Sequence, residues 1–149
     1  DALRFGKRPN DALARYRQGL AVSVPAQEWS ACLTLLTRAG ETCLELEDWA
    51  EAEGYFSLAT DVAAKLLNAT ALCDSHEQCG VAQAAQHDHE GAARSWVTAK
   101  DFSKRYGYLV RFTSAIDRLI ALYEQASLPK KVDALQAERA AGVAGGAAA

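Results

Sequence analysis

The sequence repeats itself with a period of forty residues, and this period constrains the fold more than any other feature. A small residue followed four positions later by an aromatic one recurs in three places: Ala12 with Tyr16, Ala52 with Phe56, and Ala92 with Trp96. Two further columns follow, each after three more residues. Spacings of three and four place such residues on one face of an α-helix. These columns therefore predict helices at residues 10–23, 49–67, 89–106 and 129–140.

A second set of columns with the same spacing lies between the first four helices. It predicts three more helices, at residues 26–46, 69–86 and 109–126. The junctions support this division, because Asp48 and Asp88 stand where an N-cap residue is needed. Glu51 lies three residues after Asp48, as in a capping box, and Pro129 suits the first turn of the last helix.

The repeated residues resemble the tetratricopeptide repeat, in which small, aromatic and glycine residues recur at fixed positions of a helical hairpin. The residues that carry the resemblance are Leu36, Ala39 and Gly40 with Ala52, Phe56 and Ala59; Cys79 and Gly80 with Ala92, Trp96 and Ala99; Leu119 with Tyr123; and Ala12, Tyr16 and Gly19. The forty-residue period is similar to the longer hairpins of spindle-orientation adaptors, kinesin light chains and the SNAP family. The sequence departs from the family pattern at His76, Ile120 and Gln136.

The resemblance implies an all-α fold, a right-handed α-solenoid of antiparallel helix hairpins with about seven helices. We expect one domain over residues 1–140, with a half-repeat at 10–23 and hairpins at 26–67, 69–106 and 109–140. Residues 141–149 contain only Ala, Gly and Val and are expected to form a tail or linker. The alternative is a helical bundle, which needs no fixed period. Because a solenoid end requires a cap, we expect the array to continue upstream or to be covered by another chain.

In arrays of this family the first helix of each hairpin lines the concave face, so the resemblance implies a partner-binding groove there. Its expected residues are Thr34, Thr37, Glu41, Leu44, Glu45, Asp74, Glu77, Val81, Ala84, Ala85, Ser114, Asp117, Ala121, Glu124 and Gln125. This set contains six carboxylates and no lysine or arginine. A groove of this kind favours a basic or amphipathic helical segment of another protein. The simpler interpretation is that these acids only solvate a helix face.

Composition excludes several other functions. The net charge is −3 without a basic face, so we expect no nucleic-acid partner. No apolar stretch reaches the ~20 residues that a membrane-spanning helix needs. The four cysteines fall on apolar helix positions, where cysteine acts as a small hydrophobe, and we expect an intracellular, cytoplasmic protein with reduced thiols. The chain lacks methionine even at position 1, which suggests that it is cut from a longer polypeptide.

One group of side chains could hold a metal ion, namely Cys73, His76, Cys79, His87 and His89. Successive members three residues apart on a helix diverge by roughly 60°, so the end members of such a set point apart. A packed, structural role explains all five, and we expect no metal, no cofactor and no catalytic site. The predicted function is a protein–protein interaction scaffold or adaptor. The alternatives are a structural segment of a large multiprotein assembly and a metal-binding regulatory domain or enzyme.

Overall fold

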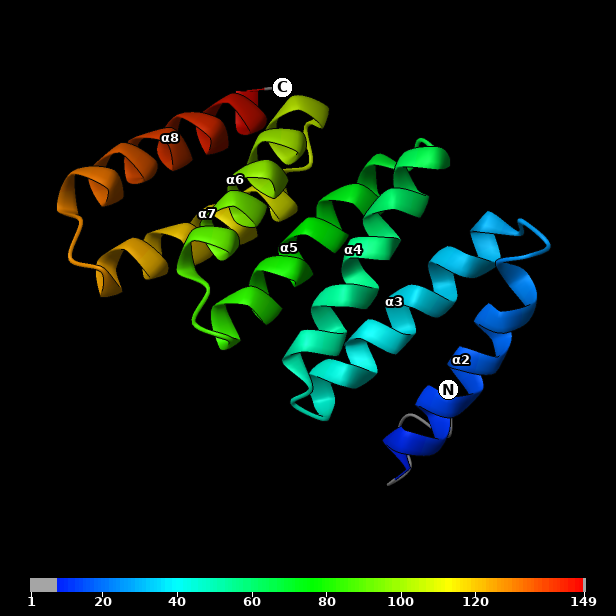
Figure 1. Ribbon diagram of the computed structural model, residues 1–149. Helices are drawn as coiled ribbons and strands as arrows, with labels where there is room; N and C mark the ends of the chain where they lie inside the picture. The colour runs from blue at the N-terminus through cyan, green and yellow to red at the C-terminus, as the bar shows by residue number, and fades with distance from the viewer. Residues whose placement is uncertain (1–7, 149) are drawn as a thin grey trace.

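The protein is an all-helical solenoid in which each helix packs mainly against its neighbours along the chain. A computed structural model describes residues 8–148; residues 1–7 of the expected domain and Ala149 lie outside this range. Seven helices lie within the described part: α2 (Pro9–Ser23), α3 (Trp29–Glu45), α4 (Trp49–Lys65), α5 (Ala69–Ala85), α6 (His89–Tyr106), α7 (Leu109–Gln125) and α8 (Pro129–Ala148). Figure 1 shows them following one another in chain order, from α2 at one end of the array to α8 at the other. The predicted fold class is confirmed.

Every turn between helices closes in the same way, and this gives the array its regularity. At the turn between α3 and α4, the Asp48 N–H donates to the Cys43 carbonyl at 2.9 Å and the Glu47 N–H donates to the Leu44 carbonyl at 3.1 Å. The same pair of bonds closes the other five turns, with a left-handed residue every twenty positions: Gln27, Glu47, Leu67, His87, Gly107 and Ser127. This is the Schellman closure, which satisfies the last carbonyls of a helix. The hairpin period of forty is therefore twice a helix-plus-turn unit of twenty.

The helix starts agree with the predicted N-cap residues, but the predicted capping box does not form. Asp48 and Asp88 each accept a backbone hydrogen bond from the residue three positions on. Glu51, however, does not complete a capping box with Asp48, whose N–H is taken by the Cys43 carbonyl. Its carboxylate instead binds Arg17 Nη2, so it ties α4 to α2. The predicted start of the second helix at residue 26 is wrong, because α3 begins at Trp29 after the turn at Gln27.

The core consists of large rings placed against small residues of the neighbouring helix. The ring of Phe56 on α4 lies against Gly40 on α3, and that of Trp96 on α6 lies against Gly80 on α5. Trp96 Nε1 also donates to the Glu77 carbonyl at 3.0 Å, which satisfies its only polar group. The alternation of small and aromatic residues in the sequence is therefore the packing pattern of successive helices.

The two ends of the array differ from its middle. Val22 on α2 is 72% exposed, although the equivalent Val62 is buried; among the described helices α2 packs mainly on α3. At the other end, α8 continues through Ala148, so the segment expected as a tail is a helical extension where the structure describes it. Gly142 in this extension lies against the ring of Phe112 on α7. None of the described helices is long and apolar enough to span a bilayer.

Candidate functional site

A cleft of about 620 Å³ opens between α3 and α5, the first helices of two successive hairpins. Its lining residues are Leu33, Thr34, Thr37, Arg38, Glu41, Phe56, Ala71, Asp74, Ser75 and Gln78. Four of them belong to the groove predicted from the sequence, namely Thr34, Thr37, Glu41 and Asp74. The walls mix hydroxyl, amide and charged groups, and Phe56 lies beneath them as part of the core. Such a lining offers both apolar contact and hydrogen-bonding partners.

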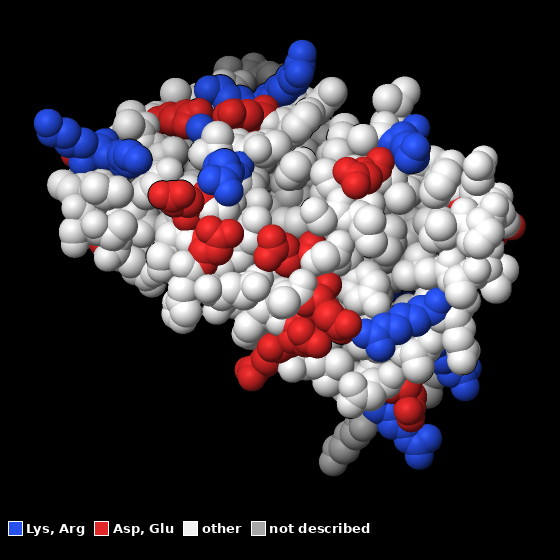
Figure 2. Space-filling model, in the orientation of Figure 1, with Lys and Arg blue, Asp and Glu red and all other residues white. Residues whose placement is uncertain are grey.

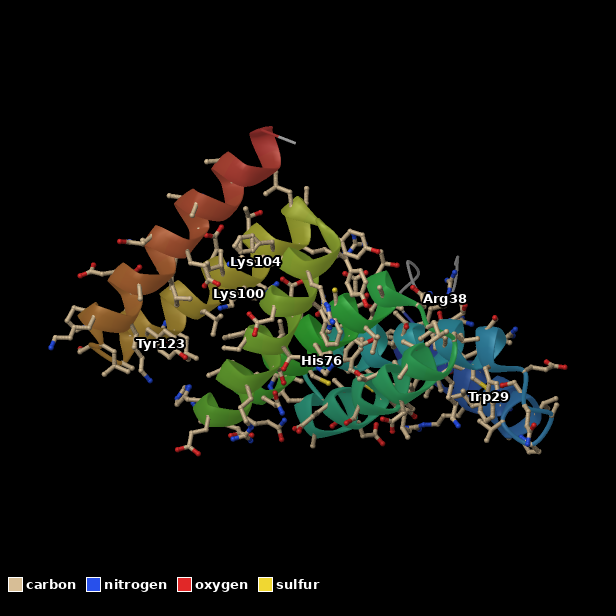
Figure 3. All side chains as sticks on the ribbon, turned by 90° about the horizontal axis from the view of Figure 1, so that it is seen from above. Trp29, Arg38, His76, Lys100, Lys104 and Tyr123 are labelled. Carbon is tan, nitrogen blue, oxygen red and sulfur yellow. The ribbon has the colours of Figure 1, made fainter. Side chains whose placement is uncertain are left out.

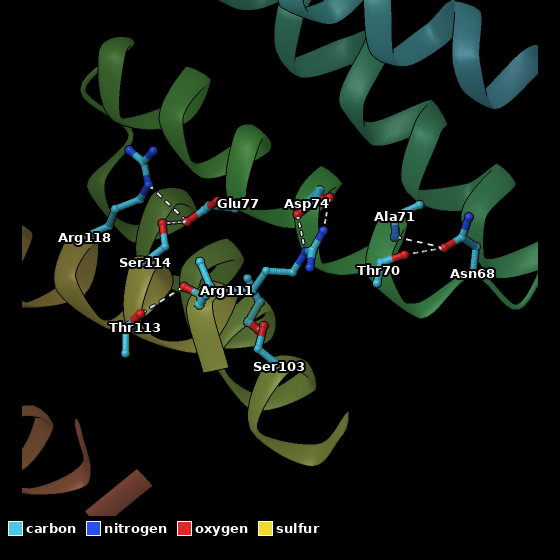
Figure 4. Close-up of polar contacts among 12 residues, drawn as sticks. Asn68, Thr70, Ala71, Asp74, Glu77, Ser103, Arg111, Thr113, Ser114 and Arg118 are labelled. Atoms are coloured by element: carbon cyan, nitrogen blue, oxygen red, sulfur yellow. Dashed lines mark hydrogen bonds and ion pairs between the residues drawn. The ribbon is translucent and has the colours of Figure 1, made fainter. Parts of the chain in front are cut away.

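The equivalent space between α5 and α7 is bridged by side chains that cross from one helix to the other. Arg111 Nε donates to Asp74 Oδ1 at 2.8 Å. On the next turn, Glu77 accepts hydrogen bonds from Ser114 and from Arg118, the latter at 3.3 Å. Figure 4 shows these contacts joining the two helices.

The cleft between α3 and α5 and the bridged space between α5 and α7 differ in the residues at equivalent positions, which are forty residues apart. Asp74 and Arg111 of the bridged pair correspond to Thr34 and Ala71 in the open one, and these two side chains carry no charge, so no ion pair can form there. Direct contact between first helices of successive hairpins is found for α5 and α7. The cleft therefore lies at a repeat interface whose equivalent positions lack the side chains that bridge α5 to α7.

The predicted groove is less acidic than the sequence alone indicates. Several of its carboxylates form ion pairs within the chain, among them Asp74 with Arg111, Glu77 with Arg118, and Asp117 with Arg139 at 2.7 Å. The hydrogen bond from Arg111 to Asp74 also raises the pKa of that guanidinium above its usual value. In Figure 2, a band of acidic side chains crosses the middle of the face shown, with basic side chains on either side of it.

The other predicted groove residues are spread along the array. Leu44, Val81 and Ala84 are partly buried and pack against core clusters, so they form a floor rather than a free surface. Ala85 and Ser114 are also partly buried. The remaining ones are exposed on α3 or α7: Glu45, Asp117, Ala121, Glu124 and Gln125.

Sequence reasoning missed the basic residues of this face. Arg38 lines the cleft, and Arg111 and Arg118 bridge α5 to α7. A signal was present in their spacing, because Arg111 and Arg118 follow Asp74 and Glu77 by close to one repeat length. Residues separated by one period lie on adjacent hairpins, where opposite charges can pair.

The five residues considered for a metal site do not come together. Cys79 packs in the cluster around Phe56, whereas Cys73 lies beside Ser103 of α6. Burial, with a smaller contribution from the charge of Glu53, raises the pKa of the Cys79 thiol to about 11. The ring of His76 stacks on that of Phe102, and the rings of His87 and His89 meet edge to face with centroids 6.1 Å apart.

Over residues 8–148, no group of three or more His, Cys, Asp or Glu side chains is arranged to hold a metal ion. All four cysteines are free and buried. Comparison of the sequence with models of protein families finds no match, and neither does a search of curated proteins.

Proposed function

We propose that the chain is a protein-interaction scaffold that holds a peptide or helix of a partner in the cleft between α3 and α5. The observation that carries this proposal is the opening of the cleft at one repeat interface while the next is bridged. A helical solenoid exposes its inner face to partners because its helices pack only on their neighbours. A cleft of about 620 Å³ can accept side chains of a helix or of an extended segment.

The chemistry of the lining favours a partner segment with both apolar and basic side chains. Leu33, Phe56 and Ala71 supply the apolar surface. The charged lining groups are two carboxylates, Glu41 and Asp74, and one guanidinium, Arg38. Asp74 already pairs with Arg111 at an exposed site, so a lysine or arginine of the partner would share these carboxylates rather than meet an unpaired charge. The exposed part of that attraction would weaken with salt.

The proposal is tested with two short amphipathic helical peptides, one rich in Leu and Lys and the other in Leu and Glu. Binding to the whole chain is measured by fluorescence anisotropy at low and high salt. We expect the basic peptide to bind at least about tenfold more tightly than the acidic one, and to weaken as salt rises. Thr37→Trp fills the cleft and should abolish this binding, whereas Ala14→Trp on exposed α2 should not.

A second variant closes the cleft by a different route. Thr34→Asp with Ala71→Arg copies the bridge between Asp74 and Arg111 into the preceding repeat. It should lower peptide affinity without adding bulk to the floor. Binding that is unchanged in both cleft variants, or absent in the wild-type chain, would contradict the proposal.

A structural segment of a larger assembly is the second candidate, and the exposed apolar residues favour it. Six large ones lie at or beside the turns that join α2 to α3, α4 to α5 and α6 to α7: Val22, Val24, Leu67, Tyr106, Leu109 and Val110. These turns follow one edge of the array in Figure 1. A row of apolar side chains along an edge suits a folded neighbour. Under this candidate neither test peptide binds, and replacing Leu67 and Val110 with serine weakens association with that neighbour.

A further inference from the structure

Two successive repeats differ in the space between the start of the second helix of one hairpin and the end of the following helix. Side chains fill this space in one repeat and leave it open in the next. Between the start of α4 and the end of α5, Gln86 Nε2 donates to Glu53 Oε1 at 2.8 Å and to the Trp49 carbonyl at 3.5 Å. Gln83 Nε2 donates to the second oxygen of Glu53 at 3.3 Å. These side chains occupy the space between the two helices.

Forty residues further on, the residues that could fill this space are replaced. Ala126 stands in place of Gln86, and Ala93 in place of Glu53. A pocket of about 670 Å³ opens there, between the start of α6, the end of α7 and the start of α8. Its lining residues are His89, Glu90, Ala93, Arg94, Leu122, Tyr123, Gln125, Ala126, Leu128 and Lys131. This volume lies within the usual range of ligand pockets.

The pocket has an apolar interior and two cations at its rim. Leu122 is buried and Tyr123 partly buried, and both belong to the cluster beneath the pocket. Arg94 comes from α6 and Lys131 from α8, and the Lys131 ammonium lies 5.1 Å from the centre of the Tyr123 ring. Within residues 8–148, neither cation has an ion-pair partner. Glu90 is the single carboxylate of the lining, so positive charge exceeds negative.

We infer that this pocket is a second docking site, which receives a bulky apolar side chain from an acidic segment of a partner protein. The apolar interior would take the side chain, and Arg94 and Lys131 would pair with carboxylates beside it. The inference goes beyond the proposed function, because the pocket shares no lining residue with the cleft between α3 and α5. In Figure 3, Tyr123 lies near the turn between α7 and α8, well apart from Arg38 of the cleft.

Three labelled peptides with identical flanks test the inference. Their cores are Leu-Phe-Glu-Glu, Ala-Ala-Glu-Glu and Leu-Phe-Lys-Lys, and binding to the whole chain is followed by fluorescence anisotropy. We expect the first peptide to bind at least about tenfold more tightly than either of the others. Equal binding of the first two would show that no apolar pocket is used, and equal binding of the first and third would show that the rim cations play no part. Either result overturns the inference.

The decisive variant copies the filled arrangement of the preceding repeat. Ala93→Glu with Ala126→Gln reproduces the pair formed by Glu53 and Gln86, and should weaken the Leu-Phe-Glu-Glu peptide about tenfold or more. Thr37→Trp, which alters only the other cleft, should leave this peptide unaffected. Unchanged affinity in the filled variant overturns the inference.

Two further measurements keep the test decisive. If the filled variant does not fold by circular dichroism, Arg94→Glu with Lys131→Glu takes its place and should reverse the preference toward the Leu-Phe-Lys-Lys peptide. A preference that does not change counts against the site. Sedimentation of the wild-type chain checks whether a second copy covers the pocket, since a dimer lost with Arg94→Glu and Lys131→Glu would replace the acidic partner as occupant.

Discussion

The ring of Phe56 lies so close to Gly40 that a Cβ atom at residue 40 would stand 2.7 Å from the ring. Helices α3 and α4 can approach this closely only because residue 40 has no side chain. Gly54, also inside a helix of this hairpin, has no heavy atom within 4 Å of the corresponding position. The two glycines therefore differ in their surroundings although both lie within helices.

This contrast predicts opposite effects of alanine at the two positions. Gly54→Ala should stabilise the protein by about 0.5–1 kcal/mol, because glycine in a helix loses more backbone entropy on folding than alanine. Gly40→Ala should destabilise it by about 1–2 kcal/mol, because displacement of the Phe56 ring outweighs the same gain. Urea unfolding of the two variants measures both free energies. A stabilising Gly40→Ala would show that the ring moves aside freely.

The turn residue Leu67 offers a way to stabilise the protein. It has a left-handed φ of 52° and is 88% exposed, whereas Gly107 occupies the same turn position in the next repeat. Since leucine is strained in this conformation and glycine is not, Leu67→Gly should raise the free energy of unfolding by about 0.5–1 kcal/mol. Gly107→Leu should lower the free energy of unfolding by a similar amount. Backbone strain is the cause of this loss, since no atom lies close enough to Gly107 to clash with a side chain. Thermal unfolding of both variants checks the opposite signs.

His76 should make the protein less stable in acid. Burial lowers its pKa below the usual 6.5, so below that pH the unfolded chain takes up a proton more readily than the folded one. The loss of stability is absent above the unfolded pKa and grows as pH falls through the folded pKa. His76→Leu copies Leu36 of the preceding repeat and should gain stability over the wild type between pH 7.5 and pH 5. Parallel pH profiles for the two proteins would contradict this.

A half-buried ion pair joins α6 to α8. Lys100 Nζ lies 2.8 Å from Glu138, and their side chains are 11% and 25% exposed. Burial lowers the pKa of Lys100, but the hydrogen bond to Glu138 and the charge of Asp101 outweigh it, so the net shift is upward. Glu138→Gln should therefore destabilise the protein by about 1–3 kcal/mol.

The matched control for this prediction is Asp74→Asn, which removes a carboxylate from an exposed pair with Arg111. Exposed pairs contribute little, so the expected loss is at most about 0.5 kcal/mol. Chemical unfolding of both variants gives the comparison. Equal losses would show that burial does not strengthen the contact between Lys100 and Glu138.

The helices, their order and most of their limits follow from the sequence because they depend on local chemistry. Apolar spacing and N-cap residues such as Asp88 act over a few turns of helix, and the forty-residue columns repeat these local signals from hairpin to hairpin. The late start of α3 at Trp29 is an exception, because Gln27 takes a left-handed conformation that its residue type does not indicate.

Which repeat interfaces are bridged and which remain open depends on side chains that come from two different hairpins. Asp74 and Thr34 occupy equivalent places, yet only Asp74 meets an arginine, and that partner lies on the next hairpin. Gln86 and Ala126 also occupy equivalent places. The Gln86 side chain is long enough to reach Glu53 and fill the space between the helices, whereas Ala126 leaves the equivalent pocket open. The regular array of helices could be predicted from the sequence because the signals for it are local. The cleft and the pocket depend on pairs of side chains about one repeat apart, and their contacts exist only once the hairpins have stacked.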